Sequence, residues 1–187
     1  MTTSLETSGR WTAYLASVFH ATELPLTIVE LPRAKQTIEI LTMLRREHLW
    51  NNPIPESFRS VPNKPILQFN GQPAWAEFIL LRLLERGGWN GAWVKNWGGR
   101  AFWSNPLQPI ELSLSAKALF RRIEKRTGAC GGCWDILAWR GDDFLFIESK
   151  QHGRDRLRFT QQTWIESALE EGIPLSSFAI VEWLTLI

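Results

Sequence analysis

Two carboxylates and a lysine in the C-terminal half of the chain are spaced so that neighbouring strands could bring them together. Asp135 opens one stretch of alternating apolar residues, and Glu148-Ser149-Lys150 closes the next. Opposed side chains on paired strands lie about 4.5–5.5 Å apart, where like charges repel. Two facing carboxylates therefore indicate a cation, and Mg²⁺ or Mn²⁺ suits oxygen ligands. With the Lys150 ammonium beside them, the chemistry indicated is metal-dependent hydrolysis of a phosphodiester bond.

The turn between the two stretches determines which residues face each other. Gly141-Asp142 predicts a two-residue hairpin turn, which places Asp135 opposite Glu148. A four-residue loop over 140–143 would give the same pairs. One face would then carry Asp135, Leu137, Trp139, Phe144, Phe146, Glu148 and Lys150, and the other Trp134, Ile136, Ala138, Leu145, Ile147 and Ser149. The alternative to a catalytic site is a surface ion-pair cluster on a half-exposed sheet.

Apolar periodicity and turn signals predict the elements that hold these residues. We expect helices over 73–87, 115–126 and 160–171, a strand or hairpin over 91–103, and strands over 133–139, 144–149 and 177–185. This order predicts an α/β fold with a mixed central sheet flanked by helices. Residues 1–69 contain six prolines and predict a helical N-terminal extension of unknown role, with weak helices around 10–20 and 33–49.

Composition excludes several classes of protein. The chain has 187 residues, of which 44% are hydrophobic and 21% charged, so intrinsic disorder is excluded. No apolar stretch approaches the roughly 20 residues of a membrane-spanning helix. The first residues lack an export signal, and a cytoplasmic protein is expected. The net charge is only +2, but residues 117–158 contain ten basic and six acidic residues.

The sequence around the lysine resembles a known nuclease family. Asp135 followed by Glu148-Ser149-Lys150 resembles the D…(D/E)xK signature of the PD-(D/E)xK superfamily, and residues 155–164 resemble its VRR-NUC branch. In that branch a D-R-L-S loop precedes a helix with a glutamine six residues after the aspartate and often an aromatic three residues later. Gln161 and Trp164 stand at those offsets. The resemblance covers about residues 74–185.

The resemblance implies a restriction endonuclease-like domain over 70–187 that cuts DNA with Mg²⁺ or Mn²⁺. Branched or flapped DNA and a homodimer are the expected substrate and assembly, and the N-terminal extension could hold a protein partner. The implied metal ligands are Asp135, Glu148, the carbonyl of Ser149 and, as an outer acid, Glu77. Lys150 would orient or activate the attacking water, and Gln161 would position Lys150 or the water. Glu85 on the same predicted helix is the alternative to Glu77, whose apolar surroundings favour it.

Other residues invite further interpretations. Two basic sets are candidates for phosphate contacts: Lys117, Arg121 and Lys125 on a predicted helix, and Arg154, Arg156 and Arg158 beside the predicted site. A solvated helix face would also explain the first set. Trp93 and Trp97 could stack on unpaired bases, although core packing is the usual role of tryptophan. His152 could touch a phosphate or be an exposed loop residue.

Three alternatives concern the chain as a whole. Cys130 and Cys133 form a CxxC pattern, but zinc needs four ligands and no histidine stands at finger spacing, so a glycine turn is the simpler interpretation. The chain could be a nucleic-acid-binding scaffold that keeps a nuclease fold. Retention of the charged positions favours an enzyme over this scaffold. It could also be an RNase or a defence nuclease with the same site.

Overall fold

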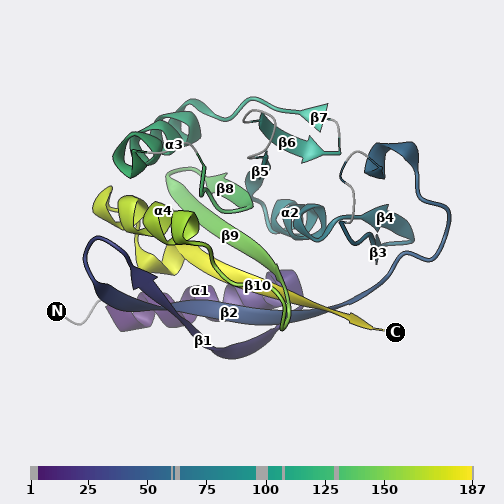
Figure 1. Cartoon of the computed structure of the whole chain (residues 1–187), viewed down its shortest axis with the longest axis horizontal. Coiled ribbons are helices and arrows are strands. Elements are labelled where there is room, and N and C mark those ends of the chain that lie inside the picture. Colours follow the sequence, from purple (N-terminus) through teal and green to yellow (C-terminus); the bar gives the residue numbers. More distant parts are fainter. Residues whose placement is uncertain are drawn as a thin grey trace.

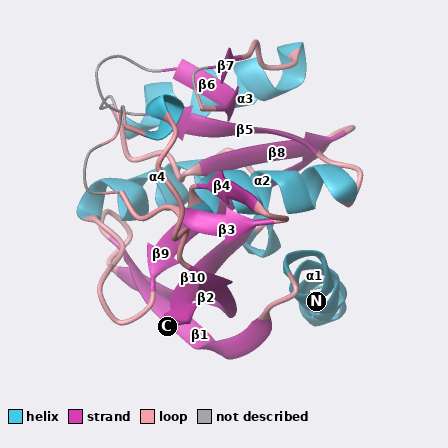
Figure 2. Cartoon of the chain, turned by 90° about the vertical axis from the view of Figure 1, so that its right-hand side faces the viewer, coloured by secondary structure: helices cyan, strands magenta, loops and turns pink. Residues whose placement is uncertain are grey.

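An eight-stranded sheet organises the molecule. The computed structural model describes residues 4–59, 61, 64–95, 101–106, 108–128 and 131–186, with side chains from residue 12 onward. The strand order is β1-β2-β10-β9-β8-β5-β6-β7, which Figure 2 shows from bottom to top. The strands are β1 (Thr22–Leu31), β2 (Gln36–His48), β5 (Asn90–Lys95), β6 (Ala101–Asn105), β7 (Gln108–Pro109), β8 (Ile136–Arg140), β9 (Asp143–Gln151) and β10 (Phe178–Leu186). A separate hairpin joins β3 (Leu67–Phe69) and β4 (Gln72–Ala74).

The sheet is mixed and mostly antiparallel, with helices on both faces. Only β10 runs parallel to its neighbours, β2 and β9. The helices are α1 (Ser4–Phe19), α2 (Ala76–Arg86), α3 (Leu114–Thr127) and α4 (Phe159–Glu170), with short 3₁₀ helices at Glu56–Phe58 and Leu175–Ser177 (Figure 1). The predicted α/β class with a mixed sheet is confirmed. No helix in the described part of the chain is long and apolar enough to span a membrane.

Each face of the sheet has its own apolar core. On one face, side chains of α1 and α2, such as Leu84, share an apolar cluster with Ile147 of β9. On the other face, side chains of α3 and α4, such as Trp164, share a second cluster with Phe146 of the same strand. Because consecutive strand residues point to opposite faces, the alternating apolar residues of β8 and β9 fill both cores at once.

The β8–β9 hairpin has the predicted register. Arg140 pairs with Asp143 and Ile136 with Ile147, around a two-residue turn in which Gly141 has a φ of 60°. A glycine with positive φ at the first turn position suits the right-handed twist of a hairpin. One assignment to a face is wrong: Trp134 packs in the core shared by α3 and α4, because it precedes the strand and is free of its alternation.

The predicted helix over 33–49 is wrong. This segment forms the long strand β2, in which β-branched Thr37, Ile38, Ile40 and Thr42 favour extended backbone. The preceding strand β1 was not predicted, because Pro25 marked a break. Pro25 instead lies where the β1 register shifts between Leu24 and Thr27, on an edge strand that tolerates a missing N–H. Residues 22–48 therefore supply two strands of the central sheet instead of a helical extension.

A charged clamp fixes the β1–β2 turn to α4. The buried carboxylate of Glu166 accepts hydrogen bonds from the backbone N–H groups of Arg33 (3.0 Å) and Ala34 (2.6 Å), and from the Arg33 guanidinium (3.2 Å). Burial raises the pKa of Glu166, but these hydrogen bonds outweigh it and lower the pKa below its ordinary value. The clamp ties the edge strand β1 to the helix that carries Gln161.

Candidate active site

The register of the hairpin brings the two predicted ligand carboxylates together. Asp135 lies one residue before β8, and Glu148 lies in β9. The backbone N–H of Asp135 donates to Glu148 Oε2 (3.2 Å), and the backbone N–H of Ser149 donates to Asp135 Oδ2 (3.0 Å). The Asp135 carbonyl also accepts from the backbone N–H of Val94 in β5 (2.7 Å). Backbone N–H groups therefore hold both carboxylates in place.

Lys150 and Gln161 complete a hydrogen-bonded cluster around Glu148. The Lys150 ammonium lies 2.8 Å from Glu148 Oε1, and the Gln161 amide donates to the same oxygen at 2.6 Å. Lys150 also donates to Gln161 Oε1 (3.4 Å), which accepts from the backbone N–H of Arg158 as well (3.0 Å). Gln161 lies in the first turn of α4, so the helix N-terminus positions it. Glu148 is 2% exposed and Lys150 9%.

Glu77 reaches the same region from α2. It lies in the first turn of the helix and is buried, and its Oε1 lies 2.7 Å from the ammonium of Lys64. Its Oε2 is buried without a hydrogen-bond partner among the described residues. Glu85 instead pairs with Arg82. Of the two helix acids considered from the sequence, Glu77 is the one whose charge acts on Asp135.

Two carboxylates of the cluster have raised pKa values. Burial, followed by the charges of Glu148 and Glu77, raises the pKa of Asp135 well above its ordinary value, against smaller effects of Lys64 and the Ser149 N–H. Burial also raises the pKa of Glu148, although Lys150, Gln161 and the Asp135 N–H oppose it. The cluster is therefore short of positive charge.

The donor set fits a hard divalent ion that also binds substrate. Within the described ranges, no group of three His, Cys, Asp or Glu side chains is arranged to hold a metal ion alone. Mg²⁺ needs fewer protein ligands, because it commonly uses one or two carboxylates and completes its shell with water and substrate phosphate. Asp135 and Glu148 meet that requirement. Ser149, whose carbonyl is the third predicted ligand, donates its backbone N–H to Asp135 Oδ2. Its buried hydroxyl has no hydrogen-bond partner among the described residues.

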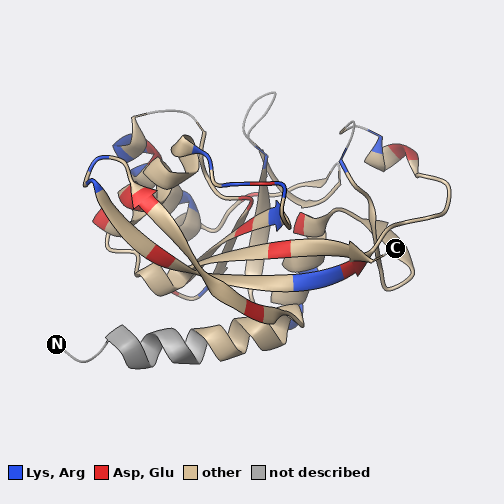
Figure 3. Cartoon of the chain, turned by 60° about the horizontal axis from the view of Figure 1, so that its bottom comes forward, with Lys and Arg blue, Asp and Glu red and all other residues tan. Residues whose placement is uncertain are grey.

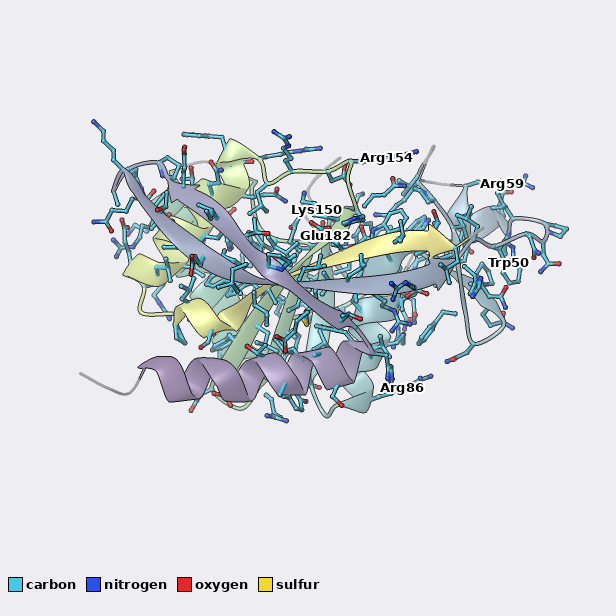
Figure 4. All side chains as sticks on the ribbon, turned by 90° about the horizontal axis from the view of Figure 1, so that it is seen from below. Trp50, Arg59, Arg86, Lys150, Arg154 and Glu182 are labelled. Carbon is cyan, nitrogen blue, oxygen red and sulfur yellow. The ribbon has the colours of Figure 1, made fainter. Side chains whose placement is uncertain are left out.

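A cleft of about 550 Å³ opens beside Lys150. It lies between β1, β10 and the loop after β9, and its lining includes Ile28, Arg154, Arg156 and Glu182. Figure 4 shows Lys150, Arg154 and Glu182 beside one another, and Figure 3 shows the charges along the loop. Asp155 shapes this loop by accepting a hydrogen bond from the backbone N–H of Gln151 (3.1 Å). Sequence reasoning missed the β1 wall, because β1 itself was not expected.

The other predicted residues have different surroundings. His152 pairs with Glu182 at the cleft, and Arg158 is the N-cap residue of α4. The three basic residues of α3 do not line the cleft: Lys117 pairs with Glu111, and Arg121 and Lys125 are exposed.

The structure changes one aromatic interpretation and bears on one of the two cysteines. The stacking role of Trp93 is wrong, because its ring is 2% exposed and packs in the core. Trp97 lies outside the described residues, as does Cys130. Cys133 is buried in the core on the side of α3 and α4.

Because Gly132 has no side chain, the first turn of α4 can pack closely against the segment before β8. A Cβ atom at Gly132 would lie 2.2 Å from the Thr160 carbonyl oxygen, and its φ is +83°. We expect Gly132→Ala to push the helix N-terminus away, moving Gln161 off Glu148 and lowering the unfolding free energy by roughly 2 kcal/mol or more. Gly131→Ala is the matched control, since its φ is also positive (+109°) but open space surrounds its Cβ position. Equal melting temperatures in the two variants would contradict the packing argument.

No protein-family model, curated protein or solved structure matches this chain. The function is therefore inferred from the side chains that the fold brings together.

Proposed function

We propose that the protein is a Mg²⁺- or Mn²⁺-dependent nuclease with a restriction endonuclease-like core that hydrolyses phosphodiester bonds in DNA. One observation carries the proposal: a single hydrogen-bonded cluster joins Asp135 before β8, Glu148 and Lys150 of β9, and Gln161 of α4. Within this cluster, Lys150 also lines the cleft that contains Arg154 and Arg156. The alternative, a surface ion-pair cluster, would have exposed side chains, whereas Glu148 and Lys150 are buried. Flapped or branched DNA and a homodimer remain predictions from the motif resemblance.

The residues divide the work of hydrolysis. Asp135, Glu148 and the Ser149 carbonyl would hold the metal ion, which supplies Lewis-acid activation of water and of the scissile phosphate. The Lys150 ammonium orients the attacking water and counters the charge that builds on the phosphate oxygens. The Gln161 side-chain amide hydrogen-bonds to both Lys150 and Glu148 and so fixes their positions relative to each other. The water oxygen bonds to phosphorus and loses a proton to the solvent, one P–O ester bond breaks, and the released oxygen takes up a proton from the solvent.

The cleft suggests the path of the DNA strand. Arg154 and Arg156 line it, and both side chains are exposed. We expect Arg154→Gln with Arg156→Gln to weaken DNA binding and to make the slope of log K against log salt shallower by roughly 1.5–2. Binding is measured in an Asp135→Asn background, so that cleavage does not consume the DNA. The same charge change at Arg121 and Lys125 of α3 serves as the control, and an equal effect there would contradict this path.

Cleavage assays test the proposed function directly. Wild type and Asp135→Asn are incubated with labelled duplex, flap, four-way junction and single-stranded DNA and with RNA, in Mg²⁺, Mn²⁺ or EDTA. We expect metal-dependent cutting of DNA by wild type alone. Cutting of RNA only would make the protein an RNase. Binding without cutting under every condition would sink the nuclease proposal in favour of a nucleic-acid-binding scaffold.

A further inference from the structure

Lys64 is a second lysine near the acid cluster: it lies over the ring of Trp93, which pairs across the sheet with Ile136, the residue after Asp135. Lys64 belongs to the irregular segment before β3, far from the catalytic motif in sequence. Its ammonium lies 5.0 Å from the ring centroid of Trp93 and 5.5 Å from that of Trp75, as well as 2.7 Å from Glu77 Oε1. Both indole rings are almost fully buried, and the Lys64 side chain is 22% exposed. A cation over the face of an aromatic ring is attracted to the ring, so the two tryptophans keep the Lys64 ammonium next to Glu77.

The charges of the cluster show what Lys64 changes. Lys150 pairs with Glu148 and Lys64 pairs with Glu77, so two of the three carboxylates have a lysine partner. Asp135 forms no ion pair with a described residue, and the charges of Glu148 and Glu77 act on it more strongly than the opposing charge of Lys64. With all three carboxylates ionised, as metal binding requires, the three acids and two lysines leave one negative charge, and one divalent ion would change this to a single positive charge. That charge matches the single negative charge of a phosphodiester.

We propose that Lys64 is the permanent second cation of the site, and that by neutralising Glu77 it limits the cluster to one divalent ion. The inference rests on the proposed nuclease function and deepens it, since many phosphodiester hydrolases use two metal ions. Lys64 acts through Glu77 and is a positioning residue. Removing its charge frees both oxygens of Glu77, one of which already lacks a hydrogen-bond partner within the described ranges. Glu77 and Asp135 could then hold a second ion.

Counting bound ions tests the inference without relying on activity. Mn²⁺ binding to the whole protein is measured by titration calorimetry and electron paramagnetic resonance. We expect wild type to bind one ion and Lys64→Met to bind two, with the Hill coefficient of Mn²⁺-dependent cleavage rising from about one to about two and cleavage slowing at least tenfold. Lys64→Arg should keep a count of one. Lys95→Met is the control, because Lys95 also lies over a tryptophan ring, that of Trp103 at 5.3 Å.

The double variant Lys64→Met/Glu77→Gln separates charge from packing. Removing both charges should return the number of bound Mn²⁺ ions to one. The melting curve of the double variant shows whether the fold survives loss of the lysine. A wild-type count of zero or two, or a Lys64→Met count that stays at one, overturns the inference. If wild type cuts DNA with metal while Lys64→Met behaves identically, only this inference fails. If wild type neither binds Mn²⁺ nor cuts, the proposed function fails with it.

Discussion

Lys150→Met is expected to reduce DNA cleavage by about 10²–10⁴-fold while leaving the fold and most DNA binding in place. The size is that of losing a group that handles the attacking water in the transition state. Methionine keeps much of the side-chain volume, so packing around β9 changes little. DNA binding should persist, because Arg154 and Arg156 in the cleft are untouched. Cleavage rate and DNA affinity are measured on the same substrate, so that the two effects are separated.

The same substitution carries a stability cost, which makes a control necessary. Glu148 is buried and would lose its only cationic partner within the described part of the chain. We expect the unfolding free energy to fall by about 1–3 kcal/mol, and the melting temperature by roughly 2–4 °C for each kcal/mol. Lys35→Met in the exposed β1–β2 turn gives the same change in net charge far from the cluster. Cleavage at the wild-type rate by Lys150→Met would remove Lys150 from the mechanism.

The local part of the site could be predicted from the sequence. The pairing of Asp135 with Glu148 depends on one glycine turn and on strand alternation, both of which lie within about fifteen residues. Gln161 is close in sequence as well, at the start of the next helix. Short-range signals were sufficient here because the proposed catalytic residues lie on or beside a hairpin and in the helix that follows it.

The long-range part of the site has no such signal. Lys64 reaches Glu77 from a proline-rich segment without periodicity, where a lysine looks like an ordinary surface residue. The strand β2 joins the central sheet by pairing in parallel with β10. Leu41, for example, pairs with Ala179, and the two residues are more than a hundred positions apart in the sequence. No local sequence pattern predicts such a long-range pair, and Pro25 indicated a break where β1 in fact forms. One wall of the cleft and the second cation of the site were therefore visible only in three dimensions.

Asp135→Asn is expected to abolish metal-dependent cleavage and yet to stabilise the metal-free protein at neutral pH. Asparagine can still accept the hydrogen bond from the Ser149 N–H, but it removes the charge that repels Glu148 and Glu77. Because the pKa of Asp135 in the folded state is raised above its unfolded value, the stability associated with this group is fully present in acid. It is lost as the pH rises through the raised pKa. Wild type and variant should therefore be equally stable in acid, and the variant more stable above that range.

Divalent metal should reverse this order, which makes the prediction specific. A ligand that binds only the folded state stabilises it, so saturating Mg²⁺ should raise the melting temperature of wild type, while Asp135→Asn loses much of that gain. We therefore expect the variant to melt higher in EDTA, by roughly 2–4 °C if the relief of repulsion is on the order of 1 kcal/mol, and lower in Mg²⁺. Melting curves in both conditions from acidic to neutral pH provide the measurement. A variant that melts below wild type in EDTA at neutral pH would show that Asp135 stabilises the fold, and would contradict a site poised for a cation.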